Sequence, residues 1–162
     1  MRNDRQNTKP AILFLCLGNI CRSPLAEGAA RAAFARAGID ATLDSAGTGD
    51  WHVGHPPDRR AQAEARRRGV DISDLRARQL SPDDFHRFDL ILAADESNLR
   101  DARAIRPADA TADLGLMLDL LPGRRGQGVT DPYYGAEDGF AATWDDVDAI
   151  ASALVARFSP SG

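Results

Sequence analysis

A single α/β domain built on a parallel sheet is the fold that this sequence predicts, on three observations. The 162 residues are the usual size of one domain, and 43% of them are hydrophobic, enough to bury one sizeable core. Short apolar runs alternate along the chain with segments that begin at helix-capping residues, and several of these segments end at glycine. This alternation predicts a three-layer domain in which a four-stranded parallel sheet carries helices on both faces and binds ligands at the carboxyl ends of its strands.

The first unit is predicted to be a strand, a tight loop and a helix. Ala11–Cys16 is a continuous apolar run, which is typical of a strand buried on both faces. A turn sequence follows at residues 17–19. Ser23 supplies a helix N-cap with proline at the next position, and the Ala-rich segment behind it runs to Gly38, a natural helix end.

The later elements continue the alternation. Further strands are expected at residues 41–44, 88–94 and 111–116, and helices are expected to run from Pro57-Asp58 to Gly69, to begin at Ser81 and at Asp95, and to span residues 139–158, with a Gly/Arg loop at residues 122–128. The domain is therefore expected to cover residues 11–159.

Residues 1–10 are expected to form a flexible tail, because they carry charges but lack the apolar centre of a secretory signal. Without an export signal we expect a cytoplasmic protein with reduced thiols. No apolar run approaches the roughly 18 residues of a membrane span. A net charge of −4 argues against general nucleic-acid binding. Because Lys9 is the sole lysine and lies outside every glycine-rich loop, a P-loop kinase or NTPase is excluded. We expect a monomer.

The loop after the first strand, residues 16–23, carries the chemical information. If the loop curls around one centre, its backbone N–H groups form an anion-binding nest, joined by the positive end of the following helix. Gly18 and Asn19 are the residue types best able to adopt left-handed conformations where the curl is tightest. Arg22 adds a planar fork that can hold two phosphate oxygens.

Cys16 is expected to be the nucleophile of this loop. Helix N-termini and neighbouring cations lower the pKa of a thiol from about 8.5 to roughly 3.5–7.5, so we expect a thiolate at neutral pH. A free cysteine at the end of a strand is often only a buried apolar residue. The combination with Gly18, Asn19 and Arg22 in register favours the nucleophile instead.

A thiolate that attacks phosphorus needs an acid to protonate the leaving oxygen, and the loop contains none. The best candidate is Asp131, which opens the sequence Asp131-Pro132-Tyr133-Tyr134-Gly135. An Asp-Pro pair also marks an ordinary turn. The acid assignment therefore depends on the thiolate loop.

Residues 15–24 (LCLGNICRSP) and 131–135 (DPYYG) together resemble the low-molecular-weight protein tyrosine phosphatase family. Shorter segments at residues 45–48, 50–51, 77–79 and 95–99 also look like family segments. By this resemblance Cys16 forms a phosphocysteine intermediate, Arg22 binds substrate and stabilises the transition state, and Asp131 acts first as general acid and then as general base. The resemblance implies no metal or cofactor.

The resemblance also implies supporting roles. Ser23 would hydrogen-bond the departing thiolate, while Asn19 and Ser45 would hold the shape of the loop. The substrate-binding residues would be the loop positions and an aromatic slot that favours aryl phosphates: Leu17, Gly18, Asn19, Ile20, Cys21, Ser23, Trp51, Tyr133 and Tyr134. Leu75 stands where relatives often carry histidine, which would remove a hydrogen-bond partner of Ser23. His52, His55 and His86 show no metal-ligand grouping and are expected to be solvated or loop residues.

Three other functions stay open at this point. A thiol arsenate reductase shares the fold and the loop but needs further cysteines, and none follows Cys21. A phosphoarginine phosphatase would be expected to carry threonine at the position of Ile20. A phosphate-binding module without turnover is the third. The expected partners are phosphotyrosine-containing proteins, with a bacterial tyrosine kinase as one candidate.

Cys21 supports a separate hypothesis. If the loop curls, Cys21 could reach Cys16, and a sulfenic acid formed on Cys16 by an oxidant could condense with it to a reversible disulfide. The alternative is that Cys21 only packs the loop.

Overall fold

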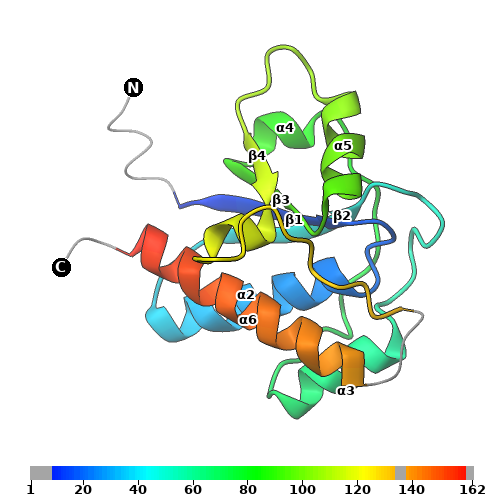
Figure 1. Cartoon of the computed structure of the whole chain (residues 1–162), viewed down its shortest axis with the longest axis vertical. Coiled ribbons are helices and arrows are strands. Elements are labelled where there is room, and N and C mark those ends of the chain that lie inside the picture. Colours follow the sequence, from blue (N-terminus) through cyan, green and yellow to red (C-terminus); the bar gives the residue numbers. More distant parts are fainter. Residues whose placement is uncertain (1–8, 134–137, 160–162) are drawn as a thin grey trace.

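The computed structural model describes residues 9–133 and 138–159, and it has the predicted α/β architecture (Figure 1). Four strands form one parallel sheet in the order β2-β1-β3-β4. They are β1 (Ala11–Cys16), β2 (Thr42–Gly47), β3 (Leu90–Ala93) and β4 (Asp113–Leu116). Both neighbours of β1 pair with it directly, so the predicted first strand is a central one.

Helices cover both faces of the sheet, as predicted (Figure 1). One face packs against α2 (Arg22–Ala37), α3 (Arg59–Arg67) and α6 (Asp138–Phe158), and the other against α4 (Asp84–Arg87) and α5 (Glu96–Ile105). A short 3₁₀ helix, η1 (Met117–Leu120), follows β4. Among the described residues no helix combines the length and the apolar character needed to cross a membrane.

The strand β1 is apolar throughout because its side chains point alternately into both layers. Ile12 and Phe14 join the cluster under α2 and α6, whereas Leu13 and Leu15 join the cluster under α4 and α5. All four side chains are fully buried. Burial of a side chain of this size contributes about 1.5–3 kcal/mol, so β1 anchors both layers.

The strand order places a ligand site next to the end of β1. From β1 the chain crosses first to β2 on one side and later to β3 on the other, so the order reverses between β1 and β3. Loops at the carboxyl ends of strands leave in opposite directions at such a point and open a crevice. Cys16 is the last residue of β1 and stands at this crevice.

Three predicted helix boundaries are confirmed by their caps. Gly38 ends α2 with φ 70°, the left-handed conformation that glycine adopts without strain, and the Asp95 side chain accepts from the backbone N–H of Asn98 at the start of α5. Asp58 likewise caps α3 by accepting from the backbone N–H of Arg60. These local signals are readable without the fold.

The strands β3 and β4 are shorter than the expected ranges 88–94 and 111–116, and three further predicted boundaries are wrong. The helix α2 begins at Arg22 after Cys21, not after an N-cap at Ser23, because the Ser23 hydroxyl bonds within the loop instead. The strand β2 continues to Gly47 since residues 45–47 pair with the end of β1, although serine and glycine have poor strand propensity. The helix α4 begins at Asp84, after a turn that starts at Ser81.

Candidate active site

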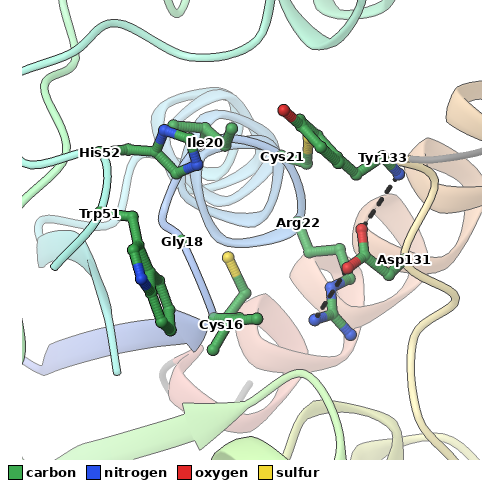
Figure 2. Close-up of a pocket in the computed structure, with 10 residues that line it drawn as sticks. Cys16, Gly18, Ile20, Cys21, Arg22, Trp51, His52, Asp131 and Tyr133 are labelled. Atoms are coloured by element: carbon green, nitrogen blue, oxygen red, sulfur yellow. Dashed lines mark hydrogen bonds and ion pairs between the residues drawn. The ribbon is translucent and has the colours of Figure 1, made fainter. Parts of the chain in front are cut away.

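A pocket of about 350 Å³ opens where the loop after β1 faces two distant segments of the chain (Figure 2). The sulfur of Cys16 points into the space between Trp51 and Arg22 (Figure 2). The lining brings together nine predicted site residues and one further residue, His52: Cys16, Leu17, Gly18, Ile20, Cys21, Arg22, Trp51, Asp131 and Tyr133. Asn19 and Ser23 are buried residues of the loop that do not line the pocket, and Tyr134 lies outside the described residues.

Asn19 holds the curl of the loop. It is the one described non-glycine residue with positive φ, 58°, and its side chain is buried. Its Oδ1 accepts from the backbone N–H of Arg78 at 3.0 Å, and its Nδ2 donates to the hydroxyls of Ser23 at 2.7 Å and Ser45 at 3.0 Å. The bonds to Arg78 and Ser45 tie the loop to the segment before α4 and to β2, and the bond to Ser23 joins two residues of the loop itself.

Cys16 receives two hydrogen-bonding groups from the start of α2. Its Sγ lies 3.1 Å from the Ser23 hydroxyl and accepts from the Ser23 backbone N–H at 3.4 Å. Both groups can stabilise negative charge on sulfur. Leu75 packs against the larger core cluster, and Ser23 keeps Asn19 and Cys16 as partners, so the leucine does not leave the Ser23 hydroxyl unpaired.

The Arg22 guanidinium is held in place by a carboxylate and a backbone carbonyl from two other segments. Its Nη1 donates to Asp95 Oδ2 at 2.8 Å and to the carbonyl of Val129 at 2.9 Å. Burial works to raise the pKa of Asp95, but the hydrogen bonds from Arg22 and from the backbone of Asn98 outweigh it, so the pKa lies below its ordinary value. Asp95 was expected at a helix start and in a family-like segment, but not at the site; its two oxygens cap α5 and orient Arg22.

Asp131 reaches the same pocket from far along the chain. Its Oδ1 accepts from the backbone N–H of Tyr133 at 3.1 Å, and its Oδ2 lies 3.7 Å from Arg22 Nη2. The side chain is 43% exposed. Arg60 at the start of α3 donates to the Tyr133 carbonyl at 2.8 Å, so this helix supports the turn that carries Asp131.

A model of the family described as "Low molecular weight phosphotyrosine protein phosphatase" matches residues 11–160. The chain belongs to this family. A Schizosaccharomyces pombe protein with that same name is 45% identical over 132 residues, which cover 80% of this chain and 84% of the relative. A human protein of that name is 40% identical over 144 residues, covering 86% of this chain and 89% of the relative.

Solved structures of related proteins share the fold over nearly their whole length. The crystal structure of YfkJ from Bacillus subtilis matches with a TM-score of 0.86 and 35% identity, covering 93% of this chain and 95% of that one. A Drosophila protein described as an arginine phosphatase matches with a TM-score of 0.86 and 28% identity, covering 93% and 99%. The predicted α/β fold is thereby confirmed by comparison as well.

The rim of this phosphatase pocket contains one residue that sequence analysis did not assign to it. His52 is a loop residue, as predicted, but it also lines the pocket, with its ring 6.4 Å from the Tyr133 ring. It packs over Gly18, where an added Cβ would lie 2.9 Å from its Cδ2 atom. The sequence signal that could have predicted this role is the position of His52 directly after Trp51, a predicted pocket residue. Among the described residues no group of histidine, cysteine, aspartate or glutamate side chains could hold a metal.

Cys21 lines the phosphatase pocket beside Cys16 as a second free thiol. Burial raises the pKa of Cys21 well above its ordinary value, and the charges of Asp58 and Cys16 raise it further. Cys21 is therefore a thiol at neutral pH and not a competing nucleophile. Its protective role against oxidation stays a prediction.

Proposed function

We propose that this protein-tyrosine-phosphatase hydrolyses phosphotyrosine in proteins, and small aryl phosphates, through a phosphocysteine intermediate on Cys16. One observation carries the proposal. The Cys16 sulfur, the Arg22 guanidinium and the Asp131 carboxyl all border one pocket, although Asp131 lies far from the loop in sequence. A nucleophile, an anion clamp and a proton donor around one pocket are what phosphoryl transfer to a thiolate needs.

In the first step, the phosphate oxygens accept hydrogen bonds from the backbone N–H groups of the loop and from Arg22. The Cys16 thiolate attacks phosphorus, and the bond from phosphorus to the phenolic oxygen breaks. The Asp131 proton passes to that oxygen, so tyrosine leaves as a neutral phenol. Because Asp131 lies at the exposed rim, it can reach a leaving group attached to a large protein.

In the second step, Asp131 is a carboxylate and takes a proton from water. The water oxygen attacks phosphorus while the P–S bond breaks, and the electron pair stays on sulfur. The Ser23 hydroxyl and backbone N–H stabilise the thiolate that leaves. Inorganic phosphate then departs, and the enzyme has its original protonation, because Asp131 again carries a proton and Cys16 is again a thiolate.

The walls of the pocket favour an aromatic substrate. Trp51 is 66% exposed at the rim, and Tyr133 lines the same space, so a phenyl ring can lie between apolar surfaces there. Phosphoserine is too short to reach Cys16 while filling this slot. We therefore propose phosphotyrosine-containing proteins as partners, with a bacterial tyrosine kinase still one candidate among them.

Phosphoarginine is the second candidate substrate, because a Drosophila structural relative is described as an arginine phosphatase. Ile20 argues against it here, since its side chain lines the pocket and has no hydroxyl that could accept from a guanidinium. We expect kcat/KM for a phosphotyrosine peptide to exceed that for free phosphoarginine. The reverse order would reassign the substrate but leave the chemistry intact.

The test of the proposal is hydrolysis of para-nitrophenyl phosphate in the presence of a metal chelator. We expect turnover by the purified protein and none by Cys16→Ser, which should still bind phosphotyrosine because the backbone nest and Arg22 remain. Persistent turnover by Cys16→Ser would remove the nucleophile assignment. A chelator-sensitive wild-type rate would contradict catalysis without metal.

A further inference from the structure

A chain of hydrogen bonds leads from Cys16 away from the pocket into the core and ends at a buried glutamate on α2. Its links are Cys16 Sγ to Ser23 Oγ at 3.1 Å, Ser23 Oγ to Asn19 Nδ2 at 2.7 Å, Asn19 Nδ2 to Ser45 Oγ at 3.0 Å, and Ser45 Oγ to Glu27 Oε1 at 2.8 Å. Glu27 is only 1% exposed. The family resemblance gives roles to the first four residues but none to Glu27.

The far end of this chain has a fixed direction. An ionised carboxylate only accepts hydrogen bonds, so the Ser45 hydroxyl must donate its single hydrogen to Glu27. Ser45 Oγ is then left with lone pairs alone and can accept from the Asn19 amide. If the group at the position of the Glu27 carboxylate donated a hydrogen bond to Ser45 Oγ, the Ser45 hydrogen would have to point elsewhere. It would then point toward the hydrogens of the Asn19 amide, which would repel it.

The direction of the hydrogen bonds near Cys16 follows from the direction fixed at Glu27. The Asn19 amide has two hydrogens, and the one not given to Ser45 goes to Ser23 Oγ. The Ser23 hydroxyl already accepts from Asn19, so its own hydrogen is free to point at Cys16 Sγ. The backbone N–H of Arg78 anchors the other end of the Asn19 amide. Glu27 and Arg78 thus fix the orientation of Asn19 from two sides.

Arg31 pairs with the buried carboxylate of Glu27. Its Nε donates to Glu27 Oε2 at 2.8 Å, and its Nη2 donates to the Leu43 carbonyl at 2.9 Å, which ties the pair to β2. The pKa of Glu27 lies above its ordinary value, because burial and the charge of Asp44 raise it more than the hydrogen bonds from Ser45 and Arg31 and the charge of Arg31 lower it. Loss of Arg31 would therefore favour the protonated acid.

We propose that Glu27, kept ionised by Arg31, is a positioning residue that directs the Ser23 hydroxyl hydrogen onto the Cys16 sulfur. This inference rests on the proposed function. The Ser23 hydrogen bond that Glu27 orients has its largest effect in the second step. There the P–S bond breaks and negative charge returns to sulfur, and a hydrogen bond to a charged atom contributes most.

The protein contains a second buried glutamate, Glu64, that provides a matched control for a Glu27→Gln variant. Glu64 on α3 is 2% exposed, and its carboxylate binds Arg67 and Arg68 on the same helix. Glu64→Gln therefore removes a buried, arginine-bound carboxylate without touching the chain of bonds to Cys16. It measures the general cost of such a substitution to folding and activity.

The deciding experiment is rapid-quench measurement of phosphorylated Cys16 during turnover of para-nitrophenyl phosphate. We expect Glu27→Gln to lower kcat by about tenfold, which corresponds to about 1.4 kcal/mol, and to raise the steady-state fraction of phosphorylated Cys16. Glu64→Gln should match the wild type in both. A Glu27→Gln enzyme within twofold of the wild type in kcat would overturn the inference.

A double-mutant cycle with Ser23→Ala separates positioning from a general structural effect. If Glu27 acts through the Ser23 hydroxyl, Ser23→Ala with Glu27→Gln should be no slower than Ser23→Ala alone. Losses that multiply would overturn the inference. Wild-type enzyme that turns over without phosphorylated Cys16 would overturn the proposed function and, with it, this role of Glu27.

Arg31→Met is a second variant that leaves the buried residues in place. Its kcat should begin to fall, as the pH is lowered, at a higher pH than in the wild type, because Glu27 then protonates more readily next to Asp44. An unchanged pH profile of kcat in a folded Arg31→Met protein would count against the inference. This variant decides the matter if Glu27→Gln does not fold.

Discussion

The two segments that meet at the pocket differ in how firmly they are held. Cys16, Asn19, Arg22 and Ser23 in the loop after β1 are buried, and their side chains bond to one another or to neighbouring strands and loops. Asp131 is exposed, and its own turn is supported by a backbone N–H and by Arg60. The nucleophile and clamp are therefore preorganised, whereas the acid stands where it can exchange protons with water and contact a protein substrate.

The largest effect that sharpens this comparison is expected from Asp131→Ala. Loss of a general acid typically costs about 10²–10⁴-fold, and the loss should be largest when the leaving group is the poorly leaving phenolate of tyrosine. Para-nitrophenolate leaves readily, so its release should slow far less. Measurement of kcat/KM for both substrates checks this, and equal losses would argue against an acid role for Asp131.

A smaller effect is expected from Arg60→Gln, because Arg60 supports the turn of Asp131 and lies over the Phe140 ring at 4.9 Å. Loss of a single supporting hydrogen bond, about 1 kcal/mol, should lower kcat/KM for phosphotyrosine roughly fivefold. The reaction of Cys16 with iodoacetamide should not change, since the loop after β1 is held by other bonds. Arg59→Gln, one residue away and exposed, is the control.

Reduced alkylation of Cys16 in Arg60→Gln would show that the two segments are not held independently. Equal effects of Arg59→Gln and Arg60→Gln on kcat/KM would show that only the charge of α3 matters. Either result would remove the contrast between a fixed loop and a separately supported acid.

The smallest effect concerns stability and the lowered pKa of Asp95. A carboxylate with a depressed pKa stabilises the folded state above its unfolded pKa of about 3.9, and this contribution disappears as the pH falls through the folded pKa. The unfolding free energy of wild type should therefore exceed that of Asp95→Asn more at pH 7 than near pH 2. Urea unfolding at both values measures the difference, and an equal gap at both would contradict the Asp95–Arg22 pairing.

Much of the loop after β1 could be predicted because its chemistry is contiguous in sequence. The apolar run to Cys16, the left-handed turn at Asn19 and Arg22 are local features, and their physical consequences follow from backbone geometry. Gly18 was expected to share the left-handed conformation but does not adopt it. Asp131 could be proposed as the acid because a thiolate loop needs one, and the family resemblance supported this, but nothing in its neighbourhood indicates which strand end it approaches.

The remaining site residues depend on contacts that sequence patterns do not reveal. Asp95 carries a local signal as a helix cap, which concealed the use of its second oxygen by Arg22. Glu27 stands in an Ala-rich helix without a clear polar face, so its burial against Ser45 could not be inferred. His52 enters the pocket because Gly18 leaves room for its ring, a fact of packing between two loops.

The phosphocysteine intermediate is the central claim, and it can be observed directly. Asp131→Ala mixed with para-nitrophenyl phosphate and quenched with acid within milliseconds should yield a peptide in which Cys16, and not Cys21, carries the mass of one phosphoryl group. The same peptide should be unmodified in Cys16→Ser. Turnover without any phosphorylated Cys16 at any quench time, or a phosphoryl group on another residue, would contradict the mechanism.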